Sequence, residues 1–209
     1  MNAAEAIATL RRLGVPAIDT ADAAAALGQS KFAASKTLSR LAENGLVTRI
    51  RQGTWWLEGA IDPYRVVEYL TAPFPSYLSL QTALYAHGMI EQIPSVHYAV
   101  SLAKPQRITT AAGTFSIHRV APELFGGYEE REPGVKIATP EKALFDVAYL
   151  SGGRSRLFAR LPELELPRGF RRSELARWTA KIPSARAKTL VKLRLDRFVG
   201  AEARRRGAR

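Results

Sequence analysis

The sequence predicts an α+β protein in which a winged helix-turn-helix at residues 1–60 precedes a mixed α/β domain at residues 61–209. Three observations carry this prediction. Three helical patterns and then two short β-prone runs follow one another in the first 60 residues. Strand patterns and helix patterns then alternate to about residue 150. Beyond that point the chain has a helical pattern and is rich in Lys and Arg.

The three helical patterns of the first 45 residues are separated by Gly and Pro. Between residues 2 and 13 apolar side chains recur every three or four positions, which is typical of an amphipathic helix. Thr20 is placed to cap a short second helix that ends at Gly28. Ser30 is placed to cap a longer third helix that ends at Gly45. Their order predicts a helix-turn-helix.

Two β-prone runs, LVTRI and TWWL, flank the segment RQG after the third helix. Gly53 can supply the positive φ of a tight turn, so the runs predict a hairpin, the wing. Because side chains alternate across a strand, we expect one of Trp55 and Trp56 to pack on the helices and the other to be partly exposed. Three helices with a hairpin also occur in protein-binding modules, so the order alone leaves that alternative open.

One face of the third predicted helix is short, polar and cationic. At about 100° per residue, Ala34, Thr37, Leu38 and Leu41 point one way. The opposite face contains Lys31, Ser35, Lys36, Ser39 and Arg40. Short side chains fit the major groove, hydroxyls can contact base edges and cations can contact phosphates. We therefore expect this helix to bind double-stranded DNA.

Three further polar side chains lie at or beside the predicted hairpin tip: Arg49, Arg51 and Gln52. They are placed to reach a minor groove or the flanking phosphates. The alternative is that the arginines only keep a surface hairpin soluble.

The chain after the hairpin predicts a mixed α+β arrangement. Residues 59–63 resemble a linker, and a helix, a Pro-rich break and a second helix from about Ser79 to His87 follow. Residues 96–103, 106–113 and 114–120 have strand patterns. Another strand precedes Thr139, which is placed to cap a helix with Pro140 at its first position and a stop at Gly152.

The net charge of +12 is concentrated in the last third of the chain. Residues 151–209 contain 17 Lys and Arg against 5 Asp and Glu, whereas the two preceding thirds are close to neutral. A strongly basic segment attracts polyanions or acidic partners. A solvated basic tail is the alternative. We expect four of these cations to form a surface that binds a partner: Arg171, Arg172, Lys188 and Lys192.

The sequence gives little sign of catalysis. It has no Cys, and the spacing of His87, His97 and His118 fits no zinc site. It lacks the common nucleotide-binding and hydrolase motifs. We therefore expect no enzyme activity, no metal and no cofactor. No signal-peptide pattern or apolar run of about 18 residues occurs, so we expect a cytoplasmic protein without a membrane segment.

The stretch TPEKALFD is the one candidate for a catalytic cluster. Its Glu141, Lys142 and Asp146 could form a carboxylate–lysine site acting on nucleic acid. The same spacing is typical of a capped helix with a glutamate in its first turn, which the helix dipole favours. We favour the second interpretation.

The order of motifs resembles the AbiEi-type antitoxins of abortive-infection, type IV toxin–antitoxin systems. The winged-helix start, YLSLQTALYAHGMIEQIP, TFSIHRVAPELFGGY and GVKIATPEKALFDVAYL carry this resemblance, which covers about residues 5–150. It implies an N-terminal domain that binds repeats in its own promoter and represses the operon. It also implies a C-terminal domain that opposes a nucleotidyltransferase-like toxin, without necessarily forming a stable complex with it. Together with the charge distribution, this makes Arg171, Arg172, Lys188 and Lys192 the surface that we expect to oppose the toxin.

Two interpretations of function follow. The first is an antitoxin that is also an autorepressor, with residues 61–209 as the antitoxin domain. The second is a stand-alone winged-helix regulator whose C-terminal domain senses a ligand.

Overall fold

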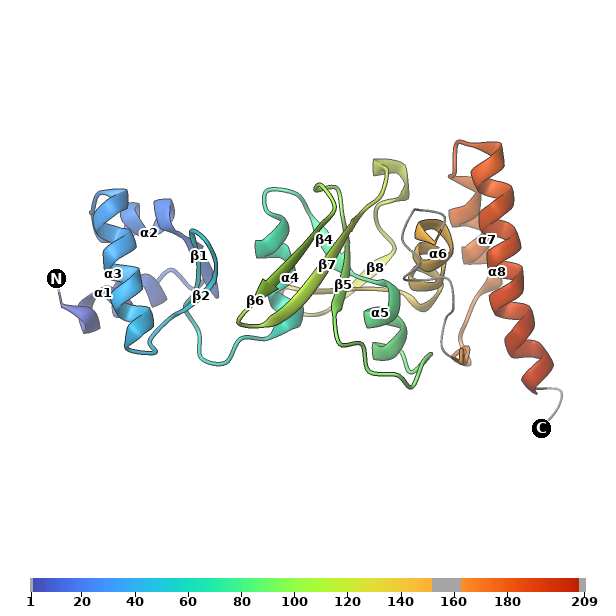
Figure 1. Ribbon diagram of the computed structural model, residues 1–209, viewed down its shortest axis with the longest axis horizontal. Helices are drawn as coiled ribbons and strands as arrows, with labels where there is room; N and C mark the ends of the chain where they lie inside the picture. Colours follow the sequence, from blue (N-terminus) through green and yellow to red (C-terminus); the bar gives the residue numbers. More distant parts are fainter. Residues whose placement is uncertain (1, 152–162, 207–209) are drawn as a thin grey trace. The chain divides into compact units, whose positions relative to one another are not determined.

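The computed structural model describes residues 2–151 and 163–206, with side chains described as far as Gly200 (Figure 1). The chain divides into two compact units. The first comprises Met1–Leu70 and Ile108–Gly113, and the second comprises Thr71–Arg107 and Thr114–Arg209. Helices and two sheets occur together, so the predicted α+β class is confirmed.

The first unit begins with three helices and a small sheet. The helices are α1 (Ala3–Arg11), α2 (Thr20–Leu27) and α3 (Lys31–Glu43), and the strands are β1 (Ala17–Asp19), β2 (Thr48–Arg51) and β3 (Thr54–Trp56). The strands pair antiparallel in the order β1-β3-β2. Figure 1 shows the three helices grouped beside this sheet. The predicted helices and hairpin are confirmed, whereas β1 was not predicted because three residues are too few to show an alternating pattern.

One hydrophobic core joins these elements. Ile7 and Leu10 from α1, Leu38 and Leu41 from α3, and Trp55 from β3 all belong to it and are buried. Each such side chain contributes roughly 1.5–3 kcal/mol when it leaves water. The inward face predicted for the third helix is therefore the face that packs, and its opposite face is left for another role.

The cap of α2 differs from the prediction. The Asp19 carboxylate accepts hydrogen bonds from the backbone N–H groups of Ala21 (2.7 Å) and Asp22 (2.9 Å), so Asp19 is the N-cap. Thr20 is instead the first helical residue and is buried. Its hydroxyl donates to the carbonyl oxygen of Gly53 at 3.2 Å. Both residue types cap helices well, but Thr20 is used to tie α2 to the hairpin.

The other signals around α3 are confirmed. Ser30 caps the helix, with its Oγ accepting from the Ala33 N–H at 3.2 Å. Gly28 ends α2 with a φ of 62°, and Gly53 forms the hairpin turn with a φ of 82°. Both backbone conformations favour glycine.

The prediction that one of the two β3 tryptophans is partly exposed is wrong, since both are buried. The reason is the helix α4 (Pro63–Thr71). Its Tyr69 ring meets Trp56 edge-on at 6.2 Å, and its Arg65 guanidinium lies 5.6 Å from the centre of the Trp56 ring. Arg65 is also ion-paired with Glu58 at 2.7 Å. This helix thus belongs with the hairpin, although it lies beyond the predicted division at residues 60 and 61.

A six-stranded sheet follows, in the order β6-β7-β5-β4-β9-β8. Its strands are β4 (Ser76–Leu78), β5 (His97–Ser101), β6 (Gln106–Thr110), β7 (Gly113–Arg119), β8 (Tyr128–Glu132) and β9 (Val135–Ala138). The pairs β4–β9 and β5–β7 are parallel, and the pairs β4–β5 and β8–β9 are antiparallel. The predicted strands occur, whereas β4 and β8 were not predicted.

Helix α6 is the centre of the helical part of the second unit. It contacts α5, α7 and α8. The bounds are α5 (Leu80–Ala86), α6 (Pro140–Leu150), α7 (Arg172–Ala180) and α8 (Ala185–Arg206), and a short 3-10 helix spans Pro122–Leu124. Thr139 caps α6, accepting from the Lys142 N–H at 3.3 Å, with Pro140 at its first position as predicted. The predicted stop at Gly152 lies outside the described residues.

Candidate nucleic-acid interface

A groove of about 720 Å³ lies between α3 and the β2–β3 hairpin. Six of the eight residues predicted to bind DNA line it: Lys31, Ser35, Ser39, Arg49, Arg51 and Gln52. The first three come from the exposed face of α3 and the last three from β2 and the turn. Side chains separated by up to 21 positions in the sequence are therefore brought to one surface.

The register of the hairpin places both arginines on the groove side. The pairing of β2 with β3 is irregular between Arg49 and Arg51, and both arginines line the groove while Ile50 between them is buried. The Arg49 guanidinium lies 5.5 Å from the centre of the Trp55 ring, a cation–π distance. Arg51 donates from Nε to the Thr54 hydroxyl at 3.2 Å. These contacts hold the guanidinium groups of both arginines against the hairpin.

A chain of hydrogen bonds fixes the hairpin against α2. The Trp55 indole N–H donates to the Thr20 hydroxyl at 3.0 Å, and that hydroxyl donates to the Gly53 carbonyl at 3.2 Å. The Thr20 backbone N–H also donates to the same carbonyl at 2.9 Å. The turn that presents Arg51 and Gln52 is thereby positioned relative to the helices. A fixed turn loses less conformational entropy when it contacts a ligand.

The charge of this groove is positive. Lys31, Arg49 and Arg51 line it, and the one carboxylate among the lining residues belongs to Asp19. That carboxylate already accepts two backbone hydrogen bonds at the start of α2. The groove therefore offers three cations and the hydroxyls of Ser35 and Ser39 to an incoming molecule, a combination that suits phosphates and base edges.

Two of the predicted DNA-binding residues, Lys36 and Arg40, do not line the groove. Both are exposed on α3. The Lys36 ammonium lies 4.8 Å from the centre of the Phe32 ring. These two cations therefore lie beside the groove, where they could contact only flanking groups.

Phe32 is a residue that sequence reasoning missed. Its side chain is 72% exposed although it is aromatic, and it lines the groove in the first turn of α3. A single exposed apolar side chain is common on proteins, but this ring lies among the cations and hydroxyls of the groove. Its spacing was the available signal, because Phe32 precedes Ser35 by three positions and Lys36 by four and so shares their face. Its apolar ring distinguishes it from the polar and cationic side chains that were expected to bind DNA.

The Glu141, Lys142 and Asp146 cluster is buried in the second unit. The side chains of Lys142 and Asp146 are fully inaccessible and form an ion pair through Nζ and Oδ1. The other carboxylate oxygen of Asp146 accepts from the hydroxyls of Ser79 (2.7 Å) and Tyr77 (3.1 Å). The residues therefore connect β4 and α5 to α6, an arrangement that neither sequence interpretation included.

Aromatic rings enclose the ammonium of Lys142. Its Nζ lies 4.6 Å from the centre of the Trp178 ring, 5.0 Å from that of Phe145 and 5.5 Å from that of Tyr77. Burial lowers the pKa of Lys142 and raises the pKa of Asp146, while the ion pair opposes both shifts. Burial, and then the Asp146 carboxylate, hold the pKa of Tyr77 well above its ordinary value. Because water does not reach this cluster, a substrate does not reach it either in this conformation.

Glu141 lies beside this cluster and has a different partner. Its side chain is 4% exposed, and its Oε1 accepts from the backbone N–H of Arg171 at 2.7 Å. Arg171 is the N-cap residue of α7. Glu141 thus fixes the start of α7 against α6.

Three of the four cations expected to bind a partner line a second groove. Arg172, Lys188 and Lys192 border a cavity of about 410 Å³ between α7 and α8. The fourth, Arg171, does not line it. The two cationic surfaces of the protein thus lie in different units.

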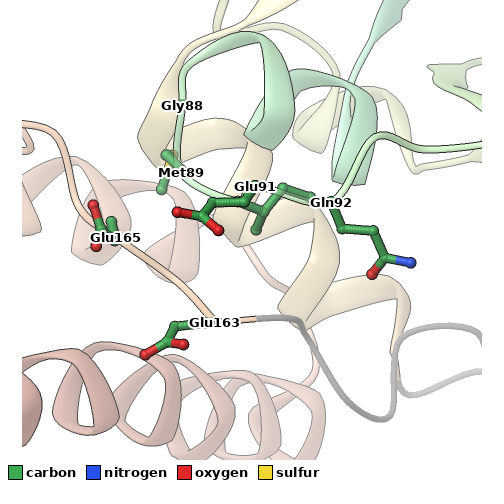
Figure 2. A pocket seen from close by; sticks show the side chains of 7 residues that line it. Gly88, Met89, Glu91, Gln92, Glu163 and Glu165 are labelled. Carbon is green, nitrogen blue, oxygen red and sulfur yellow. The ribbon is translucent and has the colours of Figure 1, made fainter.

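A third cavity, of about 500 Å³, has the opposite charge. Figure 2 shows Glu91, Glu163 and Glu165 around it, together with Met89 and Gln92. The Glu165 backbone N–H donates to the Met89 carbonyl at 2.9 Å and so holds the two segments together. Within residues 2–151 and 163–200, no group of three carboxylate, imidazole or thiol side chains is placed to hold a metal ion. An acidic cavity is unsuited to a nucleic acid.

Comparisons with known proteins leave the family open. No protein-family model matches the chain. No curated protein matches it either. Among the helices that the structure describes, none combines the length and the apolar character that crossing a bilayer requires. The membership in the AbiEi-type antitoxins that the motifs predict therefore stays a prediction.

Proposed function

We propose that residues 1–60 form a winged helix-turn-helix and that the protein is a sequence-specific DNA-binding repressor. The observation that carries this proposal is the groove between α3 and the hairpin, where six residues selected for DNA binding come together. The order α1, β1, α2, α3, β2, β3 with the sheet β1-β3-β2 supports it, because a winged helix places a hairpin directly after its recognition helix.

In this proposal α3 enters the major groove of double-stranded DNA. Ser35 and Ser39 are short enough to let the helix approach the base edges and can donate to or accept from them. Lys31 and the flanking Lys36 and Arg40 contact phosphates. Arg49, Arg51 and Gln52 lie on the hairpin and contact the adjacent backbone or minor groove.

The test is a selection of duplexes from a random pool by the full-length protein, followed by affinity measurements. We expect enrichment of a defined motif, with binding at least about a thousandfold tighter than to a scrambled duplex at physiological salt. If the protein enriches no motif, or binds selected and scrambled duplexes equally, it is not a sequence-specific regulator.

We further propose, from the resemblance of the motifs alone, that the protein is an antitoxin and represses its own operon through promoter repeats. The second unit would then oppose a nucleotidyltransferase-like toxin. The separation of the two cationic grooves agrees with separate roles. A cytoplasmic location follows from such a role.

Charge reversal of Arg171, Arg172, Lys188 and Lys192 in the full chain tests the antitoxin role. We expect loss of rescue from the toxin encoded beside the gene, with repression retained. Loss of repression with rescue retained would contradict the proposal, provided circular dichroism shows a folded variant. A gene neighbourhood without a nucleotidyltransferase gene would favour the ligand-sensing regulator instead.

A further inference from the structure

The groove between α7 and α8 has the geometry of a helix-binding seam. Residues 181–184 join the two helices, which contact each other. On α8 the groove is lined at positions 188, 192, 195, 196 and 199, so lining residues recur every three or four positions. This spacing follows one face of a helix over roughly 17 Å. The lining is therefore a continuous stripe and not an isolated hollow.

The floor of this groove is apolar. Leu175, Leu195 and Val199 form its buried base. Ala176 and Ala180 line it from α7 and are exposed. Because alanine side chains are short, they let a third helix approach α7 closely. Thr179 also lines the groove, and its hydroxyl donates to the Leu175 carbonyl at 2.7 Å. Among the described lining residues the floor therefore offers hydrophobic contact and no free donor for a phosphate backbone.

The rim of the groove is cationic and unpaired. Arg172 lies at one end of the groove wall on α7, and Lys188 and Lys192 lie on α8. Within the described part of the chain, none of these three side chains forms an ion pair. This includes Lys192, although Asp196 lies one turn further along α8. Asp196 is the one acidic residue among those lining the groove.

Three neighbouring cations are engaged within the fold. Arg194 donates from Nη1 to the Ala148 carbonyl at 3.0 Å and so ties α8 to α6. The Lys181 ammonium lies 3.9 Å from the centre of the Trp178 ring. Arg177 is ion-paired with Glu174 at 3.0 Å. Three cations near the groove are thus used within the fold, whereas Arg172, Lys188 and Lys192 border its apolar floor.

We propose that this groove binds an acidic amphipathic helix of a partner protein. Apolar side chains of that helix would pack on the floor, and its flanking carboxylates would pair with the rim cations. A helix laid between two helices completes a three-helix bundle and buries the exposed alanines. The inference goes beyond DNA binding and does not depend on it.

The shape of the groove favours this occupant over DNA. The phosphates of a duplex could contact the rim cations. The polar DNA backbone would then lie over an apolar floor, where it loses hydrogen bonds to water and gains none from the protein. A second copy of this chain is a poorer match, because the stretch of residues 171–200 that surrounds the groove has nine Lys and Arg against two acidic residues. Like charges placed across an interface repel each other.

The experiment uses the full-length protein labelled with ¹⁵N and a synthetic helical peptide of about 18 residues. The peptide has leucines along one face and glutamates on both sides of them. Amide chemical shifts report both its affinity and its position. We expect the largest shifts at Ala176, Ala180, Leu195 and Asp196. Shifts centred elsewhere, or none at millimolar peptide, would overturn the proposal.

A pair of matched variants separates the groove from its charge. Lys188→Glu with Lys192→Glu should weaken peptide binding at least about tenfold, since two attractions become repulsions. Arg186→Glu with Arg197→Glu makes the same charge change on α8 outside the groove and should change binding less than about twofold. Equal losses in both variants would mean that only net charge matters, which contradicts the proposal.

Two further measurements test the apolar floor and the rival occupants. A peptide with its leucines replaced by glutamine keeps its helicity and charge and should lose binding. Ala176→Gln with Ala180→Gln lengthens the exposed side chains of the floor without changing charge and should also weaken binding of the original peptide. Unchanged binding in either case contradicts a floor contact.

Displacement of the peptide by random duplex DNA would assign the groove to DNA instead. Self-association of the protein that the groove variants abolish would assign it to a second copy of the chain.

Discussion

The two cationic grooves of this protein have similar charge and different floors. The groove between α3 and the hairpin has three cations above a surface that contains the hydroxyls of Ser35 and Ser39. The groove between α7 and α8 also has three cations, but they border leucine, valine and alanine. The cations attract anionic partners in both cases, and the floor decides which partner can make close contact. Net charge by itself would have assigned both surfaces the same role.

The largest effect is expected from the buried ion pair of α6, the helix that contacts both helices of the second groove. Helix α6 contacts both α7 and α8 and contains Lys142 and Asp146. Asp146→Ala leaves a buried, unpaired ammonium, so we expect the free energy of unfolding to fall by about 3–5 kcal/mol. Urea denaturation followed by circular dichroism measures the change.

The control for that variant is Asp196→Ala, which removes an exposed carboxylate of α8. It should change the free energy of unfolding by less than about 0.5 kcal/mol. A loss below about 1 kcal/mol for Asp146→Ala would mean that Lys142 is not held as a buried cation.

The next largest effect is expected at Phe32. Its exposed ring lies among the residues lining the first groove, where it can pack on a thymine methyl group. Phe32→Ala should weaken binding of the selected duplex about tenfold. Leu13→Ala, which truncates an exposed apolar side chain outside that groove, should not weaken it.

Replacing thymine by deoxyuracil in the duplex tests the same contact from the other side. The substitution should weaken binding of the wild-type protein at one position and have no further effect on the Phe32→Ala variant. Additive losses from the two changes would place Phe32 away from the methyl group.

The hairpin arginines should affect the salt dependence of DNA binding. Each phosphate contact contributes about 0.9 to the slope of log affinity against log salt. Arg49→Ala and Arg51→Ala should each reduce the slope by up to about that amount without changing the preferred sequence. Arg186→Ala, in the second unit, should leave the slope unchanged. Equal slopes in all three variants would remove the hairpin from the interface.

The smallest effect is expected from pH, and only on the second unit, because the first contains no histidine. Burial lowers the pKa of His87, and the Arg131 guanidinium lowers it further. The hydrogen bond from Nε2 to the Ala138 carbonyl, at 2.7 Å, raises this pKa and so offsets part of the shift. Burial also lowers the pKa of His118. A lowered pKa means that the folded protein binds fewer protons than the unfolded chain near the ordinary value of about 6.5.

The free energy of unfolding should therefore be highest above about pH 6.5 and fall as the pH decreases below it. His87→Gln should make the decrease shallower, and His118 accounts for the remainder. Preference for the selected duplex should not follow this change while the protein stays folded. A free energy of unfolding that rises on acidification would contradict the arrangement around His87.

Local signals in the sequence predicted much of this fold. Ser30, Gly28, Gly53 and Thr139 act through their own backbone neighbourhood, so their roles could be predicted from residue type and spacing. Strand β8 could not, because the run YEERE has four charged residues and is stabilised by pairing with β9 at the edge of the sheet. Strand β4 is three residues long and follows two prolines, which conceal it.

The sites were predicted in part for the same reason. Helix periodicity brought Ser35 and Ser39 onto one face, and charge counting identified Lys188 and Lys192. The apolar floor of the second groove could not be predicted, because it depends on how α7 packs against α8. The hydroxyl partners of Asp146, Ser79 just before α5 and Tyr77 on β4, likewise lie 67 and 69 positions away in the sequence.

The most direct test of the account is the preference for the selected duplex over a scrambled one, measured in two double variants of the full chain. Ser35→Leu with Ser39→Leu places bulk in the first groove, and Lys188→Glu with Lys192→Glu reverses charge in the second. We predict that the serine variant loses its preference for the selected duplex, while the lysine variant keeps this preference within about twofold. Ala4→Leu with Ala8→Leu adds the same bulk on the exposed side of α1 and, as the control, should keep the preference. A serine variant that still prefers its own duplex, or a lysine variant that does not, would contradict the assignment of DNA recognition to α3 and its hairpin.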